Sequence, residues 1–244
     1  MPRRSPSVQR DTGVPVEIGR SFVLESSALG ERRVVDVTLP SSYHVGTDRR
    51  HPVVYLLDGE FIGPVAATMT KFYADASQLP ELIVVAVRNT DRTRDMTPPP
   101  VAGYTPPPEM GAMSGGADRF LAFLVDELIP WVDTRYRTAP MRVLAGASLG
   151  GLFALHALAK KPEVFTGYLV MEPAVWWNNE HELNAARSVH SQPAARRARV
   201  ITVNTAKLGV DSTQWGGAKP MVRHLTTTGS ATRFRSPRRR STKR

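Results

Sequence analysis

The sequence predicts an α/β fold in which helices cover both faces of a mainly parallel sheet. Short, unbroken apolar runs recur along the chain, and such runs are typical of strands that a parallel sheet buries on both faces. Longer segments with apolar residues at helical spacing lie between them. This alternation favours strand–helix units joined by right-handed crossovers. The 244 residues, of which 41% are hydrophobic, suffice for one such domain.

Two β-rich runs open the domain. Residues 22–24 and 34–39 lie on either side of a turn at residues 29–31, and Pro40 ends the second run. The buried strands that we expect after them lie at residues 52–57, 82–87, 141–145, 167–171 and 199–203.

Helical spacing and proline content assign the segments between these strands. Helices are expected at residues 62–76, 118–136, 149–160 and 178–189. Residues 97–108 are too rich in proline for a helix or a central strand, so we expect a long loop there. Loops at the carboxyl ends of strands form the ligand crevice of open α/β sheets. This loop is therefore either a wall of a ligand site or a spacer.

Composition divides the chain into three parts. We expect a flexible N-terminal segment at residues 1–20, the α/β domain at 21–207 and an irregular basic tail at 208–244. The net charge is +10, and residues 232–244 hold seven basic and no acidic side chains. This stretch favours a solvated segment over a nucleic-acid-binding arm. Its one aromatic residue, Phe234, cannot build a stacking platform.

The composition also disfavours several classes of protein. The chain has no cysteine, which excludes disulfides, zinc–thiolate sites and a cysteine nucleophile. No apolar run is long enough to span a bilayer. Residues 1–10 are polar, without the apolar segment of a signal peptide. We therefore expect a cytoplasmic protein without a membrane partner. No metal or organic cofactor is implied, and the oligomeric state is left open.

The pattern Gly-x-Ser-x-Gly occurs at residues 146–150, between a predicted strand and a predicted helix. This context is that of a nucleophile elbow, a strained turn that presents a serine hydroxyl above the sheet. Ser148 is therefore the candidate nucleophile. We expect Gly146, Gly150 and Gly151 to be required sterically, because backbone must approach closely there. The alternative is a glycine-rich strand–helix turn with an incidental serine.

Two backbone N–H groups are candidates for an oxyanion hole. Leu149 begins the helix after the serine, and the N-terminus of that helix points at the developing negative charge. The second donor of such sites comes from the loop after the third strand, which here follows Asp58-Gly59. We assign it to the Glu60 N–H, and the alternative is that Asp58-Gly59 forms a simple turn.

Further motifs together resemble the putative-esterase family of α/β hydrolases, which includes enterochelin and related siderophore esterases and is distantly similar to esterase D. They are the turn at 29–30, the strand at 34–39, Pro-Ser-Ser-Tyr at 40–43, Pro-Val-Val-Tyr-Leu-Leu-Asp-Gly at 52–59, Arg-Asp-Met-Thr-Pro at 94–98, Glu-Leu-Ile-Pro at 127–130 and Pro-Ala-Val-Trp-Trp-Asn at 173–178. The resemblance covers residues 21–204. It implies an α/β-hydrolase fold and a serine carboxylic-ester hydrolase acting on a small-molecule, siderophore-like ester. Arg94, Asp95, Trp176 and Trp177 would belong to its substrate loops.

The sequence departs from this family in two places. Ala147 precedes the serine where the family has histidine, a change that an elbow tolerates. After residue 203 the family continues with an acidic residue, a helix, a strand and a histidine loop, none of which is recognisable here. Asp211 or Glu172 could supply the acid, and His224 could supply the base. We therefore expect the C-terminal part of the fold to be incomplete.

Three interpretations of this C-terminus remain: a divergent, complete enzyme that uses His224, a truncated or frameshifted product, and a non-catalytic relative. The leading functional prediction is an esterase that transfers an acyl group through Ser148 to water. The alternative is a truncated or frameshifted, catalytically impaired α/β-hydrolase-like protein. We expect no histidine ring within about 2.6–3.2 Å of the Ser148 hydroxyl.

Overall fold

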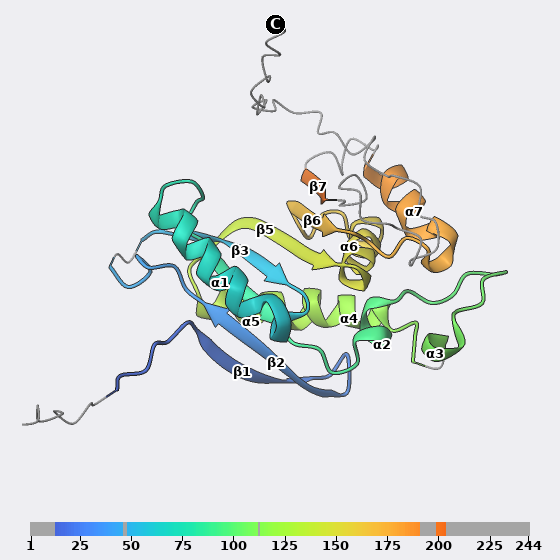
Figure 1. Cartoon of the computed structure of the whole chain (residues 1–244), viewed down its shortest axis with the longest axis horizontal. Coiled ribbons are helices and arrows are strands. Elements are labelled where there is room, and N and C mark those ends of the chain that lie inside the picture. The colour runs from blue at the N-terminus through green and yellow to red at the C-terminus, as the bar shows by residue number, and fades with distance from the viewer. Residues whose placement is uncertain (1–12, 46–47, 112, 191–198, 204–244) are drawn as a thin grey trace, which may run out of the picture.

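A computed structural model of the chain describes residues 13–45, 48–111, 113–190 and 199–203. Seven strands form one sheet in the order β1-β2-β4-β3-β5-β6-β7. The predicted basic tail and most of the predicted N-terminal segment lie outside the described residues. The strands are β1 (Arg20–Ser26), β2 (Glu31–Thr38), β3 (His51–Leu56), β4 (Ile83–Val87), β5 (Thr138–Ala147), β6 (Gly167–Met171) and β7 (Arg199–Val203); Figure 1 shows their arrangement.

The sheet is mainly parallel, as predicted. β2 runs antiparallel to β1 and β4, and every other neighbouring pair of strands is parallel. Leu56 at the end of β3 pairs with Ala145 of β5, and Ala147 at the end of β5 pairs with Met171 at the end of β6. This register brings the carboxyl ends of β3, β5 and β6 to one edge of the sheet. The loops that follow these strands are therefore neighbours.

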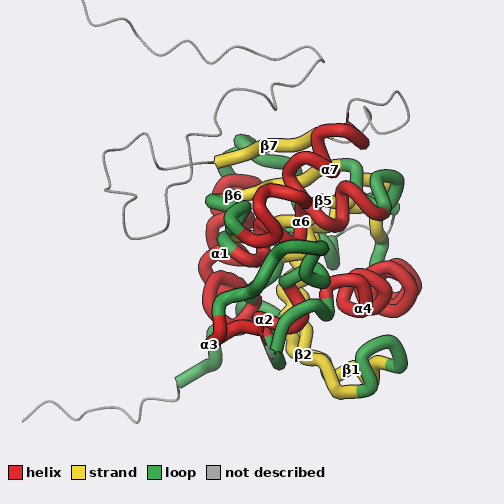
Figure 2. Tube along the Cα trace, turned by 90° about the vertical axis from the view of Figure 1, so that its right-hand side faces the viewer, coloured by secondary structure: helices red, strands yellow, loops and turns green. Residues whose placement is uncertain are grey.

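Helices cover both faces of the sheet, as the sequence predicts. α1 (Gly59–Asp75) lies on one face, and α4 (Ala117–Ala122) lies on the other (Figures 1 and 2). The larger core packs the second face against α4, α5 (Ile129–Arg135), α6 (Leu149–Lys160) and α7 (His181–His190). A smaller cluster of Leu56, Val84, Ala86 and Ala145 packs with Ile62 and Ala66 of α1.

The boundaries of two predicted helices differ in the structure. α1 begins at Gly59, three residues early, because Asp58 adopts a left-handed conformation with φ 57° and accepts hydrogen bonds from the next turn through its carbonyl. The helix predicted at 118–136 contains a π-helical turn at Phe123–Leu128. Pro130 explains that turn, since it cannot donate to the carbonyl of Asp126 and its ring crowds that group.

Three short elements complete the described structure. They are α2 (Arg92–Met96), α3 (Pro108–Gly111) and the 3₁₀ turn η2 (Trp177–Glu180). α2 lies just before the loop predicted at residues 97–108, in a segment for which the sequence analysis predicts no helix or strand, and the Asp91 side chain caps it by accepting the Arg94 N–H at 2.9 Å. Within the described residues, no helix combines the length and apolar character that crossing a membrane requires.

Candidate active site

Ser148 lies in a sharp turn between β5, which ends at Ala147, and α6, which begins at Leu149. Its backbone has φ 55° and ψ −116°, a conformation that a residue with a side chain rarely adopts. Its N–H donates to the carbonyl of Met171 and its own carbonyl accepts the N–H of Ala174, both at 3.0 Å. The side chain is exposed. The structure confirms the predicted strand–turn–helix position of the serine, with the turn held against the end of β6.

The three glycines predicted to be sterically required in this turn differ in whether the structure has room for a Cβ atom at their position. A Cβ on Gly146 would lie 2.5 Å from the backbone of Gly150, which no real side chain tolerates. A Cβ on Gly151 would lie 3.0 Å from the carbonyl oxygen of Met171. At Gly150 the nearest atom, Oδ2 of Asp58, would be 3.4 Å away, an ordinary contact. The expectation that Gly150 is sterically required is therefore wrong, because the residue faces a side chain instead of backbone.

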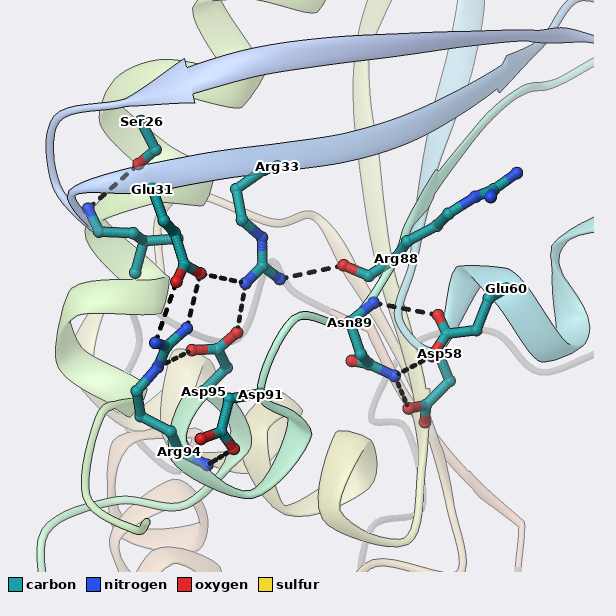
Figure 3. Close-up of polar contacts among 11 residues, drawn as sticks. Ser26, Glu31, Arg33, Asp58, Glu60, Arg88, Asn89, Asp91, Arg94 and Asp95 are labelled. Atoms are coloured by element: carbon teal, nitrogen blue, oxygen red, sulfur yellow. Dashed lines mark hydrogen bonds and ion pairs between the residues drawn. The ribbon is translucent and has the colours of Figure 1, made fainter.

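The proposed oxyanion donors belong to the first turns of two helices. Leu149 is the first residue of α6, and Glu60 is the second residue of α1. N–H groups in the first turn of a helix have no acceptor within the helix. A Cβ built on Gly150 would lie 3.4 Å from Oδ2 of Asp58, so the two helix starts are neighbours. The carboxylate of Glu60 accepts both the backbone and side-chain N–H groups of Asn89, at 3.0 and 2.7 Å (Figure 3). The donor roles of both N–H groups stay predictions.

Arg92 joins the loop after β3 to the serine turn, a role that the sequence analysis missed. Its guanidinium donates from Nε to Oδ1 of Asp58 at 2.6 Å and from Nη2 to Oδ2 at 3.0 Å. Nη2 also donates to the carbonyl of Ala147 at 3.3 Å. Paired hydrogen bonds of this kind fix both partners in orientation. The sequence does carry a signal for this role: Arg92 follows the predicted strand at residues 82–87, so it lies at the edge of the sheet where the other site loops are expected.

Arg94 and Asp95 belong to an ionic cluster that ties α2 to β2 (Figure 3). Arg94 donates to both carboxylate oxygens of Glu31, at 3.1 and 2.6 Å, and to Asp95 at 2.8 Å. Arg33, which is fully buried, donates to Asp95 at 2.5 Å. The hydrogen bonds from Arg94 hold the pKa of Glu31 below its usual value, and they raise the pKa of Arg94. Arg94 thus meets structural carboxylates here, and its predicted contact with substrate stays untested.

The two predicted tryptophans have different environments. Trp177 is fully buried, donates from Nε1 to the carbonyl of Pro98 at 3.1 Å and packs edge-on against Tyr104. The neighbouring Asn178 donates to the carbonyl of Pro99 at 3.0 Å and accepts the N–H of Val101 at 3.2 Å. This pair therefore anchors the proline-rich loop to the segment after β6. Trp176 is half-buried, so part of its ring is accessible.

The described histidine rings make no hydrogen bond with Ser148. His156 is buried and hydrogen-bonds through Nε2 to Asp118 at 2.9 Å, and burial lowers its pKa. His51 is buried at the start of β3, and His181 is exposed on α7. Glu172, the alternative acid, is exposed directly after β6. The candidates Asp211 and His224 lie outside the described residues.

Comparison with known proteins was made for the sequence and for the fold. The sequence profile of the family described as "Putative esterase" matches residues 26–231. The siderophore enterobactin esterase of Emericella nidulans is 35% identical over 179 residues, which are 63% of this chain and 57% of that protein. The siderophore triacetylfusarinine C esterase of Aspergillus fumigatus is 31% identical over 196 residues, covering 73% of this chain and 63% of that protein.

A solved structure agrees with these sequence relatives. An IroE-like serine hydrolase from Shewanella oneidensis superimposes with a TM-score of 0.69 at 33% identity, over 75% of this chain and 60% of that one. The chain thus spans only about three fifths of the length of these relatives. The match to the family profile nevertheless extends over most of the sequence. The chain therefore belongs to the putative-esterase family of α/β hydrolases, as its motifs predict.

Proposed function

We propose that this chain is a serine carboxylic-ester hydrolase in which Ser148 accepts the acyl group and passes it to water. One observation carries the proposal: Ser148 is exposed at a strained turn at the N-terminus of α6, beside the start of α1. A serine so placed is accessible to an ester, and helix N-termini favour the negative charge that develops on the carbonyl oxygen.

The proposed reaction follows from these groups. The Ser148 hydroxyl attacks the ester carbonyl while a base removes its proton. The N–H groups of Leu149 and Glu60 donate to the resulting oxyanion. Collapse releases the alcohol and leaves an acyl-serine, which water hydrolyses by the same steps. Arg92 holds Asp58, the residue that precedes α1 and Glu60, against the serine turn, so it acts as a positioning residue.

The proposed reaction needs a general base to activate Ser148. His156 is engaged with Asp118 and His51 is buried, so we place His224 in this role for testing, with Asp211 or Glu172 as its acid. Without a base, oxyanion stabilisation and binding alone still accelerate acyl transfer by about 10³–10⁴ in serine proteases. Turnover of activated esters by this chain is therefore expected to be weak if His224 does not act.

Siderophore-like esters are the proposed substrates. The named relatives are siderophore esterases, and together with the family match they support this class. The proline-rich loop, anchored by Trp177, and the accessible part of Trp176 would form walls for an acyl or catechol group. We also propose that the protein acts in the cytoplasm, without a membrane partner.

A fluorophosphonate probe tests the nucleophile directly, because it labels an activated serine and spares an ordinary one. We expect labelling of the unaltered chain and none of Ser148→Ala. Ser77→Ala is the matched control, since Ser77 is also exposed and has a similar positive φ, 57° against 55° for Ser148. Labelling that persists in Ser148→Ala would overturn the assignment. His224→Ala then tests the base: a fall in the labelling rate supports it, and an unchanged rate excludes it.

The second candidate function is a catalytically impaired α/β-hydrolase-like binding protein. The engagement of His156 with Asp118 and the burial of His51 favour it, since neither ring is available to the serine. Absence of both probe labelling and p-nitrophenyl acetate hydrolysis, in a chain that is folded by circular dichroism, would support this candidate over the esterase.

A further inference from the structure

The outward face of α1 is apolar. Phe61, Val65, Met69 and Phe72 are 71%, 63%, 44% and 63% exposed. Their spacing of four, four and three residues places them in one stripe along the helix. The buried residues of α1, Gly59, Gly63 and Ala67, lie on the opposite side. A surface helix normally shows the reverse pattern, with polar residues outward, and an exposed apolar patch of this kind marks an interaction site.

We propose that this stripe is a self-association surface, through which α1 of one copy packs antiparallel against α1 of a second copy. A two-fold contact requires a surface that is complementary to itself. In an antiparallel pair, Phe61 of each copy faces Phe72 of the other, and Val65 faces Met69. Each end of the contact thus pairs two aromatic rings, and its centre pairs the smaller Val65 with Met69.

Charge on α1 favours the antiparallel arrangement. Glu60, Lys71 and Asp75 are the charged residues of the helix, and helical spacing places them together along one flank of the stripe. Antiparallel packing brings Glu60, at the N-terminal end of one helix, towards Lys71 near the C-terminal end of the other. A two-fold parallel pair would instead place the charged flanks on opposite sides of the contact, where Glu60 and Lys71 do not meet. Opposed helix dipoles also favour the antiparallel pair.

The apolar surface continues beyond the helix. Val16 and Ile18, in the chain that leads into β1, are exposed, and a cleft of about 320 Å³ lies between this chain and α1. Pro64 and Ala67 of α1 line the cleft. A partner copy would find additional apolar contact there. A stripe of four side chains is still smaller than the roughly 800 Å² per partner of a standard interface. We therefore expect a weak dimer with a dissociation constant in the micromolar range.

A membrane surface is the competing occupant, and the charges on α1 argue against it. Helices that lie in a membrane interface are rich in Lys and Arg on the polar face. α1 has one basic residue, Lys71, and two acidic ones, Glu60 and Asp75. The helix therefore lacks the positive flank that anionic lipids attract.

Sedimentation velocity over a concentration series tests the dimer with the full chain. We expect reversible association, and we expect Val65→Glu to raise the dissociation constant by at least about tenfold. Met141→Glu is the matched control, because Met141 on β5 is 47% exposed and lies outside the stripe. A chain that stays monomeric at all concentrations overturns the proposal. So does equal weakening by both substitutions, or binding to anionic phosphatidylserine vesicles that only Val65→Glu abolishes.

The antiparallel orientation of the two helices can be tested separately by cross-linking. Because the chain has no cysteine, an introduced cysteine is its only thiol. In the antiparallel pair, Val65 lies near the two-fold axis, whereas the two copies of Phe61 lie at opposite ends. A short bis-maleimide should therefore join two copies of Val65→Cys and leave Phe61→Cys unjoined. Equal or preferred cross-linking of Phe61→Cys would exclude the antiparallel arrangement.

Discussion

Replacing Asp95 with asparagine is expected to destabilise the fold strongly. The carboxylate is 1% exposed and accepts hydrogen bonds from Arg33 at 2.5 Å and from Arg94 at 2.8 Å. Arg33 is 0% exposed, so the substitution leaves its charge buried with less compensation. Removing one partner of a buried ion pair costs about 3–5 kcal/mol. Because Glu31 still accepts from Arg33 at 2.9 Å, we expect a loss near the lower end of that range.

Urea unfolding followed by circular dichroism measures this loss as a lower midpoint at unchanged slope. Asp36→Asn is the matched control. Its ion pair with Arg88 joins side chains that are 21% and 44% exposed, and pairs at the surface contribute about 0–1 kcal/mol. If the two substitutions lower the free energy of unfolding equally, burial does not increase the contribution of the Asp95 ion pairs to stability, and the reasoning fails.

Three further predictions concern the glycines of the serine turn, the role of Arg92, and the dependence of stability on pH. Gly146→Ala should cost about 1–3 kcal/mol or more in thermal unfolding because of its backbone clash, whereas Gly150→Ala should be neutral or stabilising. Arg92→Met should slow probe labelling of the serine by about 10²-fold by freeing the loop after β3, and an unchanged rate would refute this. The lowered pKa of Glu31 stabilises the fold above its unfolded value of 4.5, and this contribution disappears as the pH falls through the folded pKa. Glu31→Gln should therefore flatten stability measured across that acidic range.

The parallel sheet could be predicted from the sequence because its strands are buried on both faces. Residues 167–171 and 199–203 form strands with the predicted bounds, and residues 149–160 form a helix with the predicted bounds. Periodicity was less informative where backbone geometry decides the boundary. The left-handed conformation of Asp58 starts α1 early, and Pro130 widens a turn inside a helix that the spacing predicts as continuous.

The site could be predicted only in part. A local motif identifies Ser148, because its chemistry depends on the strand, turn and helix that adjoin it in sequence. The roles of Arg92 and Trp177 depend instead on contacts between loops that follow different strands. Arg92 meets Asp58 across 34 residues, and Trp177 meets Pro98 across 79. Strand register brings these loops together, and register is not visible in a single sequence without the pairing partners.

The two arginines of α2 show how one short segment serves both the fold and the site. Residues two apart in a helix are separated by about 200° around its axis, so Arg92 and Arg94 point in nearly opposite directions. Asp95 fixes α2 to the buried Arg33 of β2, and Arg94 fixes it to Glu31 of the same strand. Arg92 then reaches the opposite way, to Asp58 and to the turn before Ser148. The ionic cluster therefore supports the proposed oxyanion loop from a distance, because a displaced α2 would carry Arg92 with it.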